Sequence, residues 1–234
     1  MKKLVRDLLP DYILEKIQKL LKQGSNFKSL AKNYGQWRSI RDWSSTDDSG
    51  QAIPWYTYPA TEFLSHLNLS DLKVFEYGSG NSTLWWAQHA SQVTSVEDDE
   101  LWYQRIKAEL SSTNVIYLLE QDCQRYCSMA SHDFDIFIVD GKYRRKCLDH
   151  VISLGGKGIM IILDNADWYP KTVQFIQEQL GWMQVDFHGF GPINGYTWTT
   201  SIFVNPARYH ELRYRTALKS QCGLVQQADS DLTA

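Results

Sequence analysis

Five short apolar segments separated by amphipathic stretches restrict the fold more than any other feature of this sequence. From Leu72 onward, β-branched and aromatic residues gather in runs, which are VFEY (74–77), VTSVE (93–97), VIYLL (115–119), DIFIV (135–139) and GIMIIL (158–163). Strands that alternate with helices form parallel sheets covered on both faces. The sequence therefore predicts an α/β fold with a mostly parallel sheet between two layers of helices.

Two further apolar segments near the end of the chain break this alternation. MQVDFH (183–188) and TSIFV (200–204) are joined by GFGPINGYTWT, which is rich in glycine and too short for a crossover helix. Without a crossover, neighbouring strands cannot run parallel. These two segments must pair antiparallel or lie in separate places.

The segment before the sheet has a different pattern. Residues 11–22 carry apolar side chains at helical spacing, so we expect an amphipathic helix that stops at Gly24 and packs on the main domain. Residues 25–50 are rich in turn-forming residues and predict an exposed loop. The expected divisions are an N-terminal helical extension with its loop (1–53), a main domain (54–220) and a polar, frayed tail (221–234).

The charge balance bears on partners and location. A formal net charge of -3 gives no global electrostatic reason to bind nucleic acid or an anionic membrane, so we expect a small-molecule partner. Met1 to Gly24 is charged throughout, and no later window approaches a membrane span, which favours a cytoplasmic protein. The cysteines lack a paired zinc spacing and are expected to be reduced thiols.

A glycine-containing turn follows the first predicted strand. Gly78 and Gly80 allow unusual backbone dihedrals and close approach of a ligand to main-chain N–H groups. Asn81, Ser82 and Thr83 can cap the next helix. Thr83 stands where a dinucleotide fingerprint has its third glycine, which disfavours NAD or FAD without excluding them. A merely tight turn is the alternative.

A second carboxylate, Glu97, ends the next predicted strand. An acid in this place can accept hydrogen bonds from both hydroxyls of a bound ribose. Together with the glycine turn, Glu97 favours an adenosine-containing ligand. A solvated charge at the strand end is the alternative.

The arrangement of these residues resembles class I S-adenosylmethionine-dependent methyltransferases over residues 54–205. The shared features are the acid and glycines of the first turn (Glu76, Gly78, Gly80), Glu97, Asp122, FDIFIVDG, GIMIILDN and the two closing strands. The resemblance implies a Rossmann-like seven-stranded sheet that ends in an antiparallel hairpin. It also implies that S-adenosylmethionine is the cofactor.

The resemblance gives several residues a role toward that cofactor. The residues implied to surround it are Glu76, Tyr77, Gly78, Ser79, Gly80, Ser82 and Asp140, with Glu97 on the ribose and Asp122 near the adenine amine. QDCQRY also fits an ordinary helix start, in which Asp122 is only solvated. Methyl transfer depends on in-line positioning and on removal of the acceptor's proton, so no covalent nucleophile is needed.

Three oxygen-bearing side chains end the fourth and fifth strands. Asp140, Asp164 and Asn165 are expected on one side of the same cleft and would suit Mg²⁺ or Ca²⁺. The set resembles catechol-type metal-dependent O-methyltransferases, in which a lysine just after the first Asp is the base. Here Lys142 stands two residues after Asp140 instead of three, which puts that role in doubt. A strand-end Asp can also hydrogen-bond to loop amides.

Other residues are candidates for the acceptor side. The basic cluster at 142–146 is either a solvated helix start or an attractant for an anionic acceptor. Trp55, Tyr56 and Tyr58 either fold over the cofactor or fill the core, and the loop 189–198 can close the far side. His188 is a candidate general base or a structural histidine.

The favoured function is S-adenosylmethionine-dependent methyl transfer to a small molecule, with a hydroxyl oxygen as the expected acceptor. The alternatives are an aminopropyltransferase, an NAD-dependent dehydrogenase and a non-catalytic protein that binds an adenosine ligand. Nucleic-acid methylation is disfavoured by the net charge and by the lack of an Asn-Pro-Pro-aromatic motif, since Asp140 and Gly141 follow the fourth strand.

Overall fold

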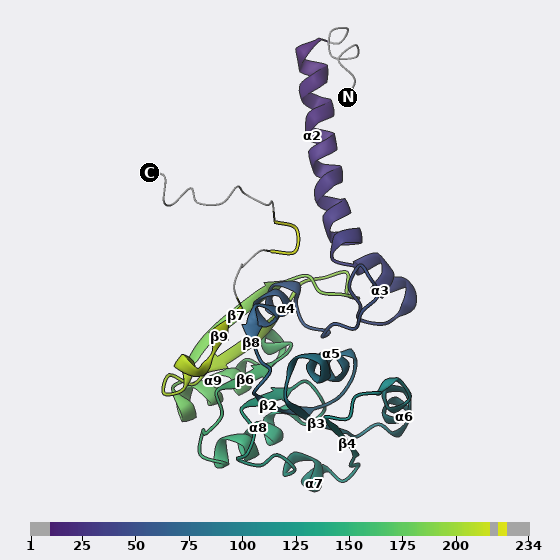
Figure 1. Cartoon of the computed structure of the whole chain (residues 1–234). Helices are drawn as coiled ribbons and strands as arrows, with labels where there is room; N and C mark the ends of the chain where they lie inside the picture. The colour runs from purple at the N-terminus through teal and green to yellow at the C-terminus, as the bar shows by residue number, and fades with distance from the viewer. Residues whose placement is uncertain (1–9, 216–219, 224–234) are drawn as a thin grey trace.

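A seven-stranded sheet forms the centre of the molecule (Figure 1) in the computed structural model, which describes residues 10–215 and 220–223. Its order is β4-β3-β2-β5-β6-β8-β7. The strands are Lys73–Tyr77 (β2), Gln92–Glu97 (β3), Val115–Leu119 (β4), Ile136–Val139 (β5), Met160–Leu163 (β6), Met183–Gly189 (β7) and Trp198–Val204 (β8). Strands β2 to β6 are parallel, and β8 is antiparallel to β6 and β7. The predicted sheet with a closing antiparallel hairpin is confirmed.

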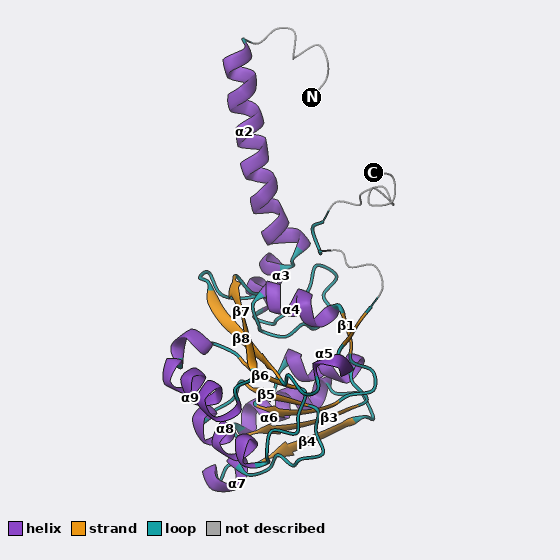
Figure 2. Ribbon diagram, turned by 90° about the vertical axis from the view of Figure 1, so that its left-hand side faces the viewer, coloured by secondary structure: helices purple, strands orange, loops and turns teal. Residues whose placement is uncertain are grey.

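Helices cover both faces of this sheet (Figure 2), as the sequence predicts. The period of two in β5 shows why: Ile136 and Ile138 pack with α4 and α5, whereas Phe137 and Val139 pack with α7, α8 and α9. The helices of the main domain are Tyr58–Ser65 (α4), Asn81–His89 (α5), Glu100–Glu109 (α6), Cys123–Cys127 (α7), Arg144–Ser153 (α8) and Pro170–Leu180 (α9). The remaining elements are the antiparallel pair Leu67–Asn68 (β1) and Arg213–Tyr214 (β9), and the 3-10 turns Ala166–Trp168 (η2) and Tyr209–Glu211 (η3).

The N-terminal segment differs from its prediction in two ways. Helix α2 spans Asp11–Lys28 and continues through Gly24, because neither packing nor backbone geometry requires a stop there. It projects from the body (Figure 1), with Leu20, Leu21 and Phe27 exposed, so the expected packing on the main domain is wrong. The predicted loop is largely helical, with a π-helix at Ser29–Asn33 (η1) and α3 at Gln36–Asp42.

Two further expectations concern the chain as a whole. No helix within the described residues is both long and apolar enough to cross a membrane. The polar tail was expected to fray, and its residues 224–234 lie outside the described part of the chain. The division of the chain at residue 53 stays a prediction.

The sheet changes its direction of growth between β2 and β5. The chain first builds outward from β2 to β3 and β4, then returns to add β5 and β6 on the opposite side of β2. In open α/β sheets, ligands bind beyond the carboxyl ends of the strands at such a switch point. The residues that follow β2 and β5 are therefore the first place to look for a site.

Candidate active site

Two glycines lie back to back at the switch point. Gly78 has a φ of +90°, and a Cβ on it would lie 2.8 Å from the Cα of Gly141. The same atom on Gly141 would lie 2.7 Å from the Gly78 nitrogen. Side chains are thus excluded from both positions, because the turns after β2 and β5 touch through their backbones. Gly80 differs from the prediction, since its φ of 165° is extended backbone that any residue adopts.

The carboxylate of Glu76 lies buried beneath the glycine turn. Its two oxygens accept hydrogen bonds from Ser82 Oγ and Thr83 Oγ1, each at 2.5 Å. Burial raises the pKa of Glu76 to about 7. Thr83 also accepts a hydrogen bond from the Gly80 nitrogen at 3.1 Å. The residue that replaces the third glycine therefore has a bonding role that no glycine could fill.

Glu97 is buried, so the alternative of a solvated strand-end charge is wrong. Its Oε2 accepts a hydrogen bond from Ser79 Oγ at 2.6 Å, and its Oε1 accepts from the backbone amides of residues 98 and 99. Burial raises its pKa. The Ser79 hydroxyl lies 2.7 Å from Tyr117 Oη, which can donate to it. A ribose that bonds to Glu97 would have to share or displace the Ser79 hydroxyl.

Two adjoining cavities open beyond this turn. The smaller, of about 70 Å³, lies between the glycine turn and the N-terminal segment, and the larger, of about 400 Å³, lies beyond β5 and β6. Both are lined by Trp55, Ser79 and Asp140. The other residues of the larger cavity are Asp164, Asn165, Trp168, Asn194, Tyr196 and Trp198. Asp140 therefore stands where the two cavities meet.

Part of the wall of the smaller cavity comes from residues to which the sequence analysis gave no role in the site. Asn81 Nδ2 donates to Ser44 Oγ at 3.0 Å and to the Ser45 carbonyl oxygen at 2.5 Å. Trp102 Nε1 donates to the Ser79 carbonyl oxygen at 2.8 Å, and its ring lies over Gly80. The abundance of tryptophan in the segment before the sheet was a signal, but no local pattern connects that segment with the glycine turn.

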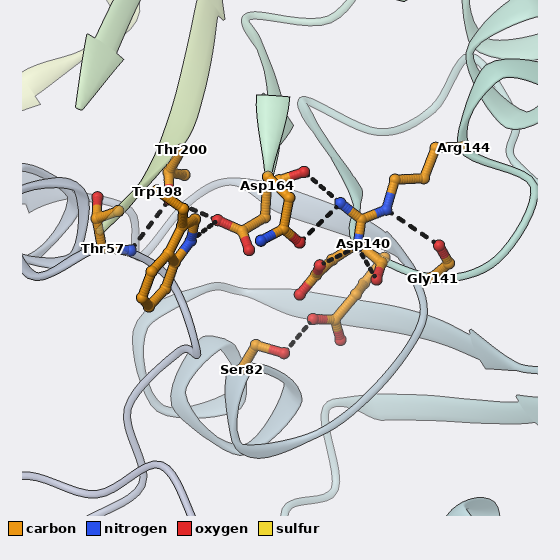
Figure 3. A network of polar contacts seen from close by, with 10 residues as sticks. Thr57, Ser82, Asp140, Gly141, Arg144, Asp164, Trp198 and Thr200 are labelled. Atoms are coloured by element: carbon orange, nitrogen blue, oxygen red, sulfur yellow. Dashed lines mark hydrogen bonds and ion pairs between the residues drawn. The ribbon is translucent and has the colours of Figure 1, made fainter. Parts of the chain in front are cut away.

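Arg144 occupies the centre of the β5 and β6 strand ends (Figure 3). Its guanidinium donates to Asp140 Oδ1 at 2.8 Å, to the carbonyl oxygens of Asp140 and Gly141 at 3.0 and 3.2 Å, to Asn165 Oδ1 at 3.0 Å and to the Asp164 carbonyl oxygen. All five guanidinium N–H groups are thereby used. The side chain is only 10% exposed, so this member of the basic cluster is not a solvated residue.

The predicted metal ligands do come together, but the residues present do not fit a metal. Arg144 already holds Asp140 and Asn165, and a divalent cation would have to share their oxygens with a guanidinium. Asp164 Oδ1 accepts from Trp198 Nε1 at 3.1 Å and from Thr200 Oγ1 at 2.5 Å. Among the described residues, no group of three or more His, Cys, Asp or Glu side chains is arranged to hold a metal. The expected Mg²⁺ or Ca²⁺ site is therefore not supported.

Three predicted site residues lie away from the two cavities. Lys142 Nζ pairs with Asp98 Oδ2 at 3.1 Å, and that hydrogen bond raises the pKa of Lys142, which is opposite to the need of a general base. His188 Nδ1 lies 2.7 Å from Thr199 Oγ1 on a separate surface hollow. Asp122 caps α7 by accepting a hydrogen bond from the Arg125 nitrogen at 2.9 Å. Its contact with adenine stays a prediction.

The predicted aromatic residues divide between site and core. Tyr56 and Tyr58 are buried in the interior, whereas Trp55 lines both cavities. The loop between β7 and β8 supplies Asn194 and Tyr196 to the larger cavity, in agreement with the expectation that it closes the far side.

No protein-family model matches the chain, and no curated protein does. Among solved structures, the chain is similar to precorrin-6y C5,15-methyltransferase from Geobacter metallireducens, at 16% identity over 62% of this chain and 86% of the other, with a TM-score of 0.49. It is also similar to M. jannaschii TYW2 in complex with AdoMet, at 14% identity over 68% and 79%, with a TM-score of 0.46. Similarities this distant specify neither a ligand nor an acceptor. The function must therefore be argued from the chemistry of the site itself.

Proposed function

We propose that this protein transfers the methyl group of S-adenosylmethionine to a hydroxyl oxygen of a small molecule. One observation carries the proposal: a cavity beside the glycine turn and a second cavity beyond β5 and β6 meet at Asp140. The first would hold the cofactor and the second the acceptor. Their junction lies at the switch point of the sheet, where such folds bind ligands.

The residues at this junction supply what methyl transfer requires. S-adenosylmethionine provides an activated methyl group, and the protein must align the acceptor with it and remove a proton. Asp140 Oδ1 is held by Arg144, while Oδ2 accepts no hydrogen bond from any described residue. In the proposed reaction Asp140 Oδ2 takes the acceptor proton as the O–CH₃ bond forms. The S–CH₃ bond breaks at the same time, and its electron pair stays on sulfur.

The lining of the larger cavity suits a neutral acceptor. Aromatic rings form much of the wall, and the polar groups are carboxylates, amides and hydroxyls, from Ser79, Asp140, Asp164, Asn165, Asn194 and Tyr196. None of the described residues that line it carries a positive charge, and Arg144 has no donor to spare. A phosphorylated or carboxylated acceptor would meet no cation there, whereas hydroxyl groups would find acceptors and apolar rings would find aromatic faces.

The smaller cavity must widen when the cofactor binds. Its 70 Å³ lies well below the roughly 300–1,000 Å³ typical of ligand sites. The wall made by Ser44, Ser45 and Trp102 is held by single hydrogen bonds to the turn. We therefore expect this wall to move outward on binding.

Calorimetric titration with S-adenosylmethionine, S-adenosylhomocysteine, decarboxylated S-adenosylmethionine and NAD tests the cofactor. Glu97→Ala should weaken S-adenosylmethionine binding by about 1.5–3 kcal/mol, because it removes a buried hydrogen-bonded carboxylate. The same loss in Asp122→Ala would support its adenine contact. Asp133→Ala, which changes an exposed acid, is the control. Tight NAD binding without a response to S-adenosylmethionine would contradict the proposal.

A labelled methyl donor tests the acceptor. The panel should contain phenols and catechols, neutral sugars, amines, and DNA and RNA. We expect the label to appear in a neutral hydroxyl compound, and cleavage of the methyl ether should release it. Label in amines or nucleic acid would leave the cofactor assignment intact and overturn the acceptor assignment.

A further inference from the structure

The guanidinium of Arg144 stands where oxygen ligands converge from two strand ends. Its five hydrogen-bond partners are all oxygens: one carboxylate, one side-chain amide and three backbone carbonyls. Carboxylate and carbonyl oxygens are also the ligands that Ca²⁺ and Mg²⁺ prefer. This centre thus has the chemistry of a cation site, and the cation in it is a side chain.

The backbone around this centre is shaped to keep the arginine in place. Tyr143, immediately before Arg144, has a φ of 58°, and Asn165 has a φ of 54°. Left-handed conformations of non-glycine residues persist where the surrounding structure fixes them. The Arg144 side chain is 10% exposed, whereas that of its neighbour Arg145 in the same helix is 45% exposed and pairs with Asp149 at 2.9 Å.

We infer that Arg144 is the resident cation of this centre, in the place of a divalent metal, and that it is the positioning residue for Asp140. It donates to Asp140 twice, at the carbonyl oxygen and at Oδ1, and leaves Oδ2 without a hydrogen-bond donor among the described residues. The positioning role in the reaction rests on the proposed methyl transfer. The assignment of Arg144 as the resident cation rests on the contacts alone.

Removal of the arginine should expose a binding site for a soluble cation. Arg144→Ala leaves the oxygens of Asp140, Gly141, Asp164 and Asn165 without a donor. We expect calorimetry to detect one Ca²⁺ or Mg²⁺ per chain in this variant and none at the centre in the wild type. Millimolar Ca²⁺ or guanidinium chloride should raise the melting temperature of Arg144→Ala and leave that of the wild type unchanged. Arg145→Ala is the matched control and should gain neither response.

Two results would overturn the resident cation. The first is a divalent cation bound at these oxygens in the wild type, seen as binding that Asp140→Asn abolishes. The second is a folded Arg144→Ala that responds to neither Ca²⁺ nor guanidinium. If Arg144→Ala is unfolded in plain buffer, refolding with either cation should restore its near-ultraviolet circular dichroism, and failure of both would also overturn it.

Activity tests the positioning role separately. Arg144→Ala should lower kcat about 100-fold, with an unchanged KM for S-adenosylmethionine, because a small misplacement of a catalytic group has effects of this size. Added guanidinium should restore kcat at least in part, and EDTA should not affect the wild type. An unchanged kcat would refute the positioning role. Absence of S-adenosylmethionine binding to the wild type would refute the proposed function, while the cation-binding result would stand.

Discussion

At the ends of β2 and β3 the buried carboxylates of Glu76 and Glu97 are held by hydroxyl and amide donors, whereas Asp140, at the end of β5, is held by an arginine. A hydroxyl can rotate away and pass its acceptor to a ligand at small cost. A guanidinium with every donor engaged cannot do so without leaving a charge unpaired. The first half of the site is therefore suited to exchange partners, and the second half to stay fixed.

The largest effect is expected at the fixed half. Asp140→Asn keeps an oxygen for Arg144 but removes the proton acceptor, so single-turnover methyl transfer should slow by about 100- to 10,000-fold. Binding of S-adenosylmethionine should be nearly unchanged. Lys142→Ala removes only the ion pair between the exposed lysine and Asp98, and should alter the rate less than about fivefold. If Lys142→Ala gives the larger loss, the base belongs to the lysine and the comparison fails.

The second-largest effect is expected where the backbones of the turns after β2 and β5 touch. Gly78→Ala must place a Cβ 2.8 Å from the backbone of Gly141 at a φ of +90°. We expect the free energy of unfolding to fall by about 2–5 kcal/mol, measured by urea denaturation. Gly24→Ala, in an exposed helix with nothing within 4 Å of the added carbon, should be neutral or stabilising by up to about 1 kcal/mol. Equal changes in the free energy of unfolding for the two variants would show that the close approach of the turns does not contribute to stability.

In the half of the site held by hydroxyl and amide donors, Glu76 should make the stability of the protein depend on pH. The pKa of Glu76 is raised to about 7 in the folded protein, so between pH 4.5 and 7 the folded state binds a proton that the unfolded chain has lost. Stability from this group is complete below pH 4.5 and is lost as the pH rises through 7. The wild type should therefore lose roughly 3 kcal/mol relative to Glu76→Gln between pH 4.5 and 8. A pH-independent difference between the two proteins would show that Glu76 stays ionised.

The smallest effect concerns the movable wall. Trp102→Phe keeps an aromatic ring over Gly80 and removes the Nε1 hydrogen bond to the Ser79 carbonyl oxygen. If the wall must open for the cofactor, the affinity of this variant for S-adenosylmethionine should change by no more than about 1 kcal/mol. The association of S-adenosylmethionine should become faster. Stopped-flow binding separates the two quantities. Slower association would mean that the wall is part of the site as it stands.

The sheet and the meeting of Asp140, Asp164 and Asn165 were predictable, because the ends of neighbouring parallel strands lie at one edge. The cation among them was not. Arg144 belongs to a run of basic residues, and only its buried place in the structure distinguishes it from Arg145, which pairs with Asp149 at the surface. The wall at Ser44 and Ser45 was missed for a related reason: its bonds to Asn81 join distant segments without any periodic pattern.

The sequence distances between Arg144 and its partners have a consequence for folding. Its hydrogen bonds reach residues that are 3, 4, 20 and 21 positions away. Loops of this size close at small entropic cost, so β5, α8 and β6 can assemble with their charge already compensated. Strand β2, whose last residue Tyr77 pairs with Val139, joins from a much earlier segment of the chain. The acid at the junction can thus be compensated by contacts that are local in sequence, without waiting for β2.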